Sequence, residues 1–185
     1  MAILGAHNTM TFNKPKHWYE YLLLPISRCQ YGNTNLSKLY NKGVRCFDIR
    51  IRIDDKNNII LCHGICDFKG NIFNALDEIN SFEEKCYIRI FPDGSNWNEY
   101  QEEFINFCEE IKQNYPLLIF FCADTEGYRI DYQGFNYIPI LKQYVGSMAN
   151  DARWYEKIIP WFYAKRMNKK NMEKNEGDII LFDFL

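Results

Sequence analysis

Residues 45–53 read Arg-Cys-Phe-Asp-Ile-Arg-Ile-Arg-Ile, and this stretch decides the fold prediction. From Phe47 to Ile53 apolar and polar residues alternate, which is typical of a β-strand with two different faces. Asp48 and Arg50 are two positions apart, so their side chains share one face, and the opposite face is apolar and faces helices. Arg50 therefore points into a barrel interior or a cleft. A buried guanidinium needs a partner, and Asp48 is the nearest one along the chain.

Working outward from this strand, short apolar stretches alternate with longer amphipathic ones. Further strands are predicted at residues 2–5, 58–62, 86–91, 117–122 and 178–184. Helices are predicted at residues 16–24, 35–42, 72–85, 97–114, around 138–145, and 152–171. Residues 127–134 fit either a short strand or a loop. Alternating strands and helices predict an α/β fold with a mainly parallel sheet, either an open doubly wound sheet or a closed barrel.

Composition narrows the class of protein. The chain has 185 residues, a net charge of −2, 47% hydrophobic and 17% aromatic residues. This predicts one ordered domain over residues 1–185 and argues against disorder and against a nucleic-acid binder. The longest apolar run, residues 117–123, is far short of the about 20 residues of a membrane-spanning helix. With no leader-like segment, we expect a cytoplasmic protein. The seven cysteines form no CxxC pair, so buried free thiols are expected.

Three polar clusters lie at predicted strands. They are Gly-Ala-His-Asn-Thr at residues 5–9, Phe-Asp-Ile-Arg at 47–50 and Cys-His-Gly at 62–64. The carboxyl ends of parallel strands form the active face of such sheets, and two histidines there suit acid–base catalysis near neutral pH. Taken singly, each cluster also has a structural explanation, such as a core histidine or an internal salt bridge.

Together these clusters resemble a known family, the X domain of phosphatidylinositol-specific phospholipase C. Residues 5–11 (Gly-Ala-His-Asn-Thr-Met-Thr) are similar to its opening motif, and residues 43–50 to its Gly-x-Arg-x-Phe-Asp-[Ile/Leu]-Arg strand. Residues 58–64 are similar to the next strand, which ends in His-Gly, and residues 72–84 to the following helix. Residues 177–184 resemble the last strand. The family fold is a distorted (β/α) barrel, so the resemblance implies a small, irregular or incomplete TIM-type barrel.

The resemblance also implies roles for individual residues. His7 would be the general base that takes the proton of the inositol 2-hydroxyl, and His63 the general acid that protonates the leaving diacylglycerol oxygen. Arg50, with Asp48 as its neighbour, would stabilise charge on the phosphate, and Asp183 would hold the imidazolium of His7. The reaction would cleave a phosphatidylinositol-type lipid to a cyclic inositol phosphate and diacylglycerol.

One of these roles has an independent geometric argument. In a closed barrel the last strand pairs beside the first. His7 follows the first predicted strand and Asp183 ends the last one. The two side chains could therefore meet in a closed barrel, although they lie at opposite ends of the chain, whereas an open sheet need not bring them together.

Calcium-dependent members of the family bind the ion through an Asn, two acidic residues of the second strand and a Glu of the fourth. Here Asn8 and Asp48 match, but Arg50 replaces the second acidic residue, and Phe91 or Pro92 stands where the Glu would be. Calcium takes six to eight oxygen ligands, so the resemblance implies a metal-independent site with no cofactor. Asn8 would then contact Arg50 or a substrate hydroxyl.

The later strands depart from the family pattern. Arg89 is a possible substitute for the basic residues that bacterial members carry there, and Asp93 and Asp124 end strands where they could bind sugar hydroxyls or simply cap loops. Residues 14–19 (Lys-Pro-Lys-His-Trp-Tyr) mix cations with aromatics, as a membrane-contacting rim would. The expected partner is a phosphoinositide or related lipid at a membrane surface, and the chain is expected to be a monomer.

Two other functions remain open at this point. A catalytically degenerate barrel could bind phosphoinositides without cleaving them. A metal-dependent glycerophosphodiesterase-like barrel also uses two histidines, but it would need an acidic metal cluster, and Arg50 argues against one.

Overall fold

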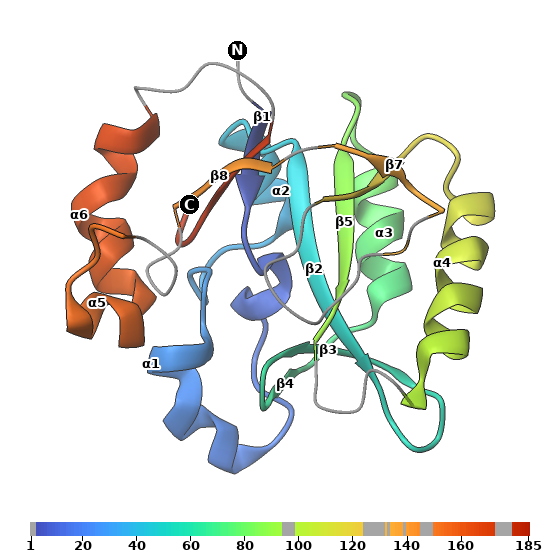
Figure 1. The fold of residues 1–185 in the computed structure, drawn as a ribbon, viewed down its shortest axis with the longest axis horizontal. Coiled ribbons are helices and arrows are strands. Elements are labelled where there is room, and N and C mark those ends of the chain that lie inside the picture. The colour runs from blue at the N-terminus through green and yellow to red at the C-terminus, as the bar shows by residue number, and fades with distance from the viewer. Residues whose placement is uncertain are drawn as a thin grey trace.

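The computed structural model of the chain describes residues 3–93, 99–123, 132, 134–138, 140–144, 150–172 and 179–185 (Figure 1). Its centre is a sheet in which neighbouring strands follow the order β7-β6-β5-β2-β1-β9-β8, and every neighbouring pair in this row is parallel. The strands are β1 (Ile3–Ala6), β2 (Cys46–Ile53), β3 (Ile59–His63), β4 (Cys66–Phe68), β5 (Tyr87–Pro92), β6 (Ile119–Cys122), β7 (Asn136–Tyr137), β8 (Ile140–Tyr144) and β9 (Ile179–Phe182). The predicted mainly parallel α/β sheet is confirmed.

The two outer strands of this row are close together in the sequence. β7 pairs with β6, and β8, which begins three residues after β7 ends, pairs with β9 at the other edge. Residues 136–144 therefore link the two edges of the sheet, and the sheet is an incomplete TIM-type barrel. The helix predicted around residues 138–145 was wrong: within this range the structure describes residues 138 and 140–144, and Ile140–Tyr144 form β8, which pairs with the apolar β9, so tertiary pairing overrides local propensity.

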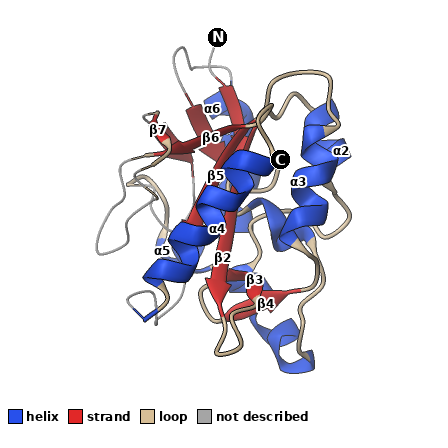
Figure 2. Ribbon diagram, turned by 90° about the vertical axis from the view of Figure 1, so that its right-hand side faces the viewer, coloured by secondary structure: helices blue, strands red, loops and turns tan. Residues whose placement is uncertain are grey.

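Helices and turns cover the outside of the sheet (Figure 2). They are η1 (Thr9–Phe12), η2 (Trp18–Leu23), α1 (Leu24–Ser27), α2 (Leu36–Asn41), α3 (Ile72–Asn80), α4 (Gln101–Asn114), α5 (Trp154–Ile158) and α6 (Pro160–Met172). The helix predicted at 16–24 is a 3-10 segment followed by one α-turn. The helix predicted at 152–171 is divided at Pro160, which lacks an N–H and is tolerated at the start of a helix.

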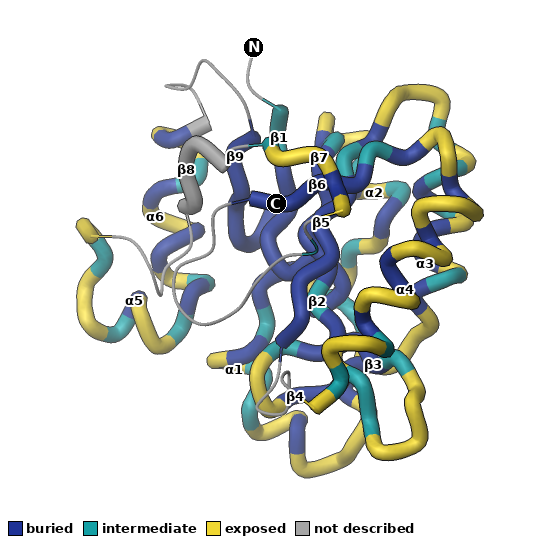
Figure 3. Tube along the Cα trace, turned by 45° about the vertical axis from the view of Figure 1, so that its right-hand side comes forward, coloured by how far each residue is buried: buried dark blue, intermediate teal, exposed yellow. Residues whose placement is uncertain are grey.

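Two apolar cores follow from the alternation within the strands. The larger one lies between sheet and helices and includes Phe47, Ile49 and Ile51, as predicted from the 45–53 stretch. The smaller one fills the barrel interior and consists of Cys46, Phe121, Ala123, Ile179 and Leu181. Strands β2, β5, β6 and β9 are largely buried, whereas β7 is exposed and the outer helices keep exposed faces (Figure 3). All seven cysteines are free and buried, as expected.

Gly5 allows β1 to pack inside this narrow barrel. A Cβ at this position would lie 2.5 Å from Leu181 Cδ2 and 3.2 Å from the Cβ of Cys46. Because side chains alternate along a strand, the next inward-facing positions on the same three strands are His7, Asp48 and Asp183. The apolar interior is thus followed, toward the carboxyl ends of the strands, by a polar layer.

β3 does not join the parallel row. It pairs with β2 in antiparallel fashion, with Ile51 opposite Leu61, and then with β4 in a hairpin. The expectation that His63 follows a parallel strand is therefore wrong: β2 extends beyond β1, and β3 runs back along this extension. Figure 1 shows the β3–β4 hairpin at the end of the barrel where the parallel strands terminate, and His63 is the last residue of β3.

Candidate active site

His7 and Asp183 meet, as the closed-barrel argument predicted. Ala6 and Phe182 are register partners in the parallel β1–β9 pair, so the residues that follow them are neighbours. His7 Nδ1 lies 2.8 Å from Asp183 Oδ1, and both side chains are buried. A carboxylate accepts hydrogen bonds, so the proton of the neutral imidazole is on Nδ1 and Nε2 carries the lone pair.

Arg50 donates a hydrogen bond to that lone pair. Its Nη2 lies 2.8 Å from His7 Nε2, and a guanidinium can only donate. This contact supports the same tautomer of His7, with Nε2 as acceptor. The proton-accepting atom of the imidazole is therefore covered by Arg50 when no ligand is bound.

Two carboxylates hold Arg50 at this position. Asp48 Oδ2 is 3.5 Å from Arg50 Nε, and Asp93 Oδ2 is 3.7 Å from Nη1. Burial would lower the pKa of Arg50, but these two charges raise it above its ordinary value. Burial likewise opposes ionisation of Asp48, yet the guanidiniums of Arg50 and Arg89 hold the pKa of this carboxyl below its ordinary value. The site keeps fixed charges of both signs.

Arg89 faces inward. Its Nη1 lies 3.7 Å from Asp48 Oδ1, and the side chain is almost fully buried. The guanidinium carbons of Arg50 and Arg89 lie 4.8 Å and 4.7 Å from the centre of the Phe91 ring. Arg89 thus supports Asp48 and, through it, Arg50.

His63 lies across the site from His7 and is partly exposed. The two ring centroids are 6.4 Å apart with the planes at 87°. His63 Nδ1 lies 2.7 Å from the carbonyl oxygen of Ser27, which fixes a proton on Nδ1 and leaves Nε2 as the titrating atom. Burial and the nearby Arg50 charge lower the pKa of His63, against the opposing effect of the Ser27 carbonyl.

The turn after His63 is fixed by a residue of a neighbouring strand. Gly64 has a φ of +58°, a conformation that favours glycine, and its N–H donates to Asp93 Oδ2 over 2.9 Å. Asp93 therefore contacts both Arg50 and the turn that carries His63. The contact with the Gly64 N–H is the loop-capping role considered from the sequence, and the contact with Arg50 adds to it.

Asn8 lies in the site, but its side chain does not point at Arg50. Its backbone N–H donates to Asp48 Oδ2 over 3.0 Å, and its Nδ2 lies 3.8 Å from Cys29 Sγ. The residue adopts a left-handed conformation, which asparagine tolerates. Asp124, the other predicted substrate contact, lies outside the described residues.

Sequence patterns missed the loop that supports His7 from behind. Gln30 Nε2 donates to the carbonyl oxygen of His7 over 2.8 Å, and Thr11 Oγ1 accepts the backbone N–H groups of Cys29 and Gln30. Residues 28–34 carry no helix, strand or motif signal that would single them out. Their place beside the site is visible only in three dimensions.

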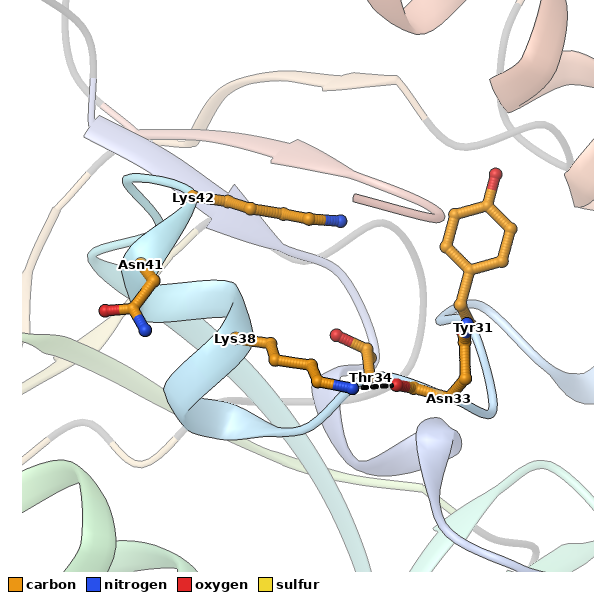
Figure 4. Close-up of a pocket in the computed structure, with 6 residues that line it drawn as sticks. All are labelled: Tyr31, Asn33, Thr34, Lys38, Asn41 and Lys42. Carbon is orange, nitrogen blue, oxygen red and sulfur yellow. Dashed lines mark hydrogen bonds between the residues drawn. The ribbon is translucent and has the colours of Figure 1, made fainter.

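A separate shallow pocket of about 250 Å³ lies beside α2 (Figure 4). Its lining residues are Tyr31, Asn33, Thr34, Lys38, Asn41 and Lys42. Lys38 Nζ donates to the carbonyl oxygen of Asn33 over 2.7 Å, so this ammonium group already has a partner. None of the predicted site residues lines this pocket.

The fold and the site define a small α/β barrel that presents two histidines, a guanidinium and a carboxylate at the carboxyl ends of its strands. No family model matches the sequence, and no curated protein does. Solved structures match the fold over 98% of the chain. Phosphatidylinositol-specific phospholipase C from Listeria monocytogenes has 16% identity, a TM-score of 0.60 and 87% of its own chain covered.

A double mutant of the corresponding enzyme from Staphylococcus aureus has 14% identity, a TM-score of 0.63 and 84% of its chain covered. The chain therefore has the fold of the bacterial phosphatidylinositol-specific phospholipases C, which confirms the resemblance at the level of the fold. At such identities the activity has to be argued from the site.

Proposed function

We propose that the chain is a phospholipase-C-like phosphodiesterase. It cleaves a phosphatidylinositol-type lipid by attack of the neighbouring inositol hydroxyl and releases diacylglycerol and a cyclic inositol phosphate. One observation carries the proposal: His7 binds Asp183 through Nδ1, presents Nε2 to Arg50, and faces the ring of His63. This is the arrangement of a base, an anion-binding cation and an acid around one small space.

The first step begins when the substrate phosphate binds. A phosphate oxygen is a stronger partner for a guanidinium than a neutral imidazole is, because the bond is between opposite charges. Arg50 then leaves His7 Nε2, and this atom accepts the proton of the 2-hydroxyl as its oxygen attacks phosphorus. Asp183, 2.8 Å from Nδ1, stabilises the imidazolium that forms.

The second half of the step is protonation of the leaving group. His63 keeps Nδ1 on the Ser27 carbonyl, so its other nitrogen, when protonated, donates to the diacylglycerol oxygen as the P–O bond breaks. Water can then open the cyclic phosphate with the two histidines in exchanged roles. Arg50 stabilises the charge that builds on the non-bridging oxygens, and Asp48 and Asp93 hold it in place.

A lipid substrate requires contact with a membrane surface, and the end of the barrel that carries the site has exposed apolar side chains. Trp18, Leu22 and Ile65 are 80%, 79% and 78% exposed. Ile65 follows His63 by two residues, and the exposed Lys14 and Lys16 precede Trp18. Apolar side chains beside lysines suit the surface of an anionic bilayer. No helix among the described residues is long and apolar enough to cross a membrane.

The test is cleavage of phosphatidylinositol in vesicles, with the cyclic inositol phosphate as the measured product. His7→Ala and His63→Ala should each lower the rate by about 10²–10⁴-fold, the usual contribution of one acid or base. His17→Ala is the matched control, assayed on a short-chain soluble substrate because His17 adjoins the proposed membrane contact. EDTA should leave the rate unchanged.

Wild-type rates in either site variant, or loss of activity in EDTA, would reject the assigned roles. If the wild-type protein binds phosphoinositides but does not hydrolyse them, the alternative function holds instead, and the chain is a catalytically degenerate binding module.

A further inference from the structure

Cys29 lies in the middle of the site, and the mechanism above does not use it. Its side chain is 1% exposed, and its sulfur lies 3.8 Å from His63 Nδ1. Three buried residues meet here: His7, Cys29 and Asp183. Each offers one donor atom, and the three donor atoms lie within 4.8 Å of one another. Three donors of different type that converge in a water-poor interior are the minimum of a metal site.

We propose that His7, Cys29 and Asp183 bind a zinc-class divalent cation, and that this ion inhibits the enzyme by occupying its general base. Bonds of about 2.0–2.3 Å to nitrogen, oxygen and sulfur place the donors of a tetrahedral zinc ion roughly 3.3–3.7 Å apart. His7 Nδ1 and Asp183 Oδ1 are already 2.8 Å apart, so these two donors separate slightly while the sulfur approaches. His63 Nδ1 lies 3.8 Å from the sulfur but donates its proton to the Ser27 carbonyl, so His63 borders the metal site without being a ligand.

The chemistry of the donors selects the metal. Thiolate and imidazole favour zinc and its spectroscopic substitutes cobalt and cadmium, whereas calcium and magnesium require oxygen ligands. Burial and the neighbouring Asp183 charge raise the pKa of the Cys29 thiol well above its ordinary value. Without a metal this thiol therefore stays protonated, and it is neither a nucleophile nor prone to oxidation.

Protons and charges balance when the ion binds. Cys29 releases its proton to solvent, so one divalent cation meets one thiolate and one carboxylate, and the cluster is neutral. The proton on His7 Nδ1 is replaced by the metal, and the neutral ring then carries its proton on Nε2. Arg50 must leave this atom, and Asp48 Oδ2, 3.9 Å away, is the acceptor available to the new N–H.

A metal-bound histidine usually donates its other N–H to a carboxylate, and Asp48 supplies this group. Arg50 retains Asp93 as a partner. With a proton on Nε2, His7 cannot accept one from a substrate hydroxyl. The metal site itself is independent of the proposed function, whereas the inhibition rests on it.

Cobalt titrated into the purified protein is the direct test. We expect a thiolate-to-metal charge-transfer absorption that saturates at one ion per chain, is displaced by zinc and is absent in Cys29→Ser. Cys86→Ser is the matched control and should keep the absorption, because Cys86 precedes β5 at the opposite end of the barrel. Asp48→Asn should weaken cobalt binding by about 10-fold or more, as loss of an outer-shell partner does.

No such absorption in the wild-type protein, or its persistence in Cys29→Ser, would overturn the proposal. If Cys29→Ser does not fold, cadmium NMR of the wild-type protein decides, since its chemical shift distinguishes one thiolate ligand from none. In the vesicle assay, zinc should inhibit the wild-type protein but not Cys29→Ser, each compared with its own rate without zinc. Zinc binding without any hydrolysis would refute the proposed function alone, and hydrolysis insensitive to zinc would refute the inhibition alone.

Discussion

Replacing Asp183 by Asn tests the link between fold and chemistry most directly. The two side chains have nearly the same shape, but the amide is neutral and can donate a hydrogen bond. It then no longer requires a proton on His7 Nδ1, and the ring can carry its proton on Nε2 instead. In that tautomer His7 cannot act as the base. The variant also removes the charge that stabilises the imidazolium of the transition state.

The size of the effect follows from the 2.8 Å contact. Two unit charges at this separation interact by about 6 kcal/mol at an effective dielectric constant of about 20. At about 1.4 kcal/mol per factor of ten, this corresponds to a loss of roughly 10⁴-fold in rate. The measurement is kcat for release of cyclic inositol phosphate from vesicles, together with thermal unfolding of each variant.

The matched control is Asp67→Asn, because Asp67 is also a buried carboxylate but pairs with Arg52 away from the two histidines. It should leave kcat unchanged. If Asp183→Asn stays within about tenfold of the wild-type rate while it folds normally, the carboxylate does not support His7 and the reasoning fails.

Three further outcomes are expected. Burial and the Arg50 charge lower the pKa of His63, and a general acid must be protonated to act. As pH rises, kcat/KM should therefore begin to fall at a pH below the usual imidazole pKa. A fall that begins only above that pKa would contradict the assigned role. Gly5→Val should destabilise the fold by about 1–3 kcal/mol in urea unfolding, since its Cβ would meet Leu181 at 2.5 Å, and unchanged stability would show that the barrel can widen. Trp18→Ala combined with Leu22→Ala should slow cleavage of vesicles but not of a short-chain soluble substrate, and equal losses on both would argue against a membrane contact.

The observed contacts explain why a resemblance limited to short motifs is enough to predict which side chains meet in the site. The polar motif residues lie at inward positions of a strand, as Asp48 and Arg50 do on β2, or directly after one, as His7 and Asp183 do, and side-chain alternation along the strand fixes the side to which they point. Between residues 92 and 176, where the motifs end, the prediction was least accurate. Within the helix predicted around 138–145, residues 140–144 form the strand β8, and the helix predicted at 152–171 is divided at Pro160.

Local patterns report the period of side chains along a segment, and strand direction needs other information. The alternation over residues 58–62 predicted β3, but it is compatible with parallel and antiparallel pairing alike. The short connection from Ile53 to Ile59 is of hairpin length, which makes the antiparallel pairing with β2 possible.

The sequence by itself determined which side chains share a face, because alternation along a strand is a local property of the backbone. It placed Asp48 and Arg50 together, and, once a closed barrel was assumed, it brought Asp183 to His7. Only the tertiary structure decided that Arg50 covers the proton-accepting nitrogen of His7, and that the sulfur of Cys29 lies close to both histidines. These contacts depend on how a loop without regular structure packs against the ends of strands distant in sequence, and no local period records that packing.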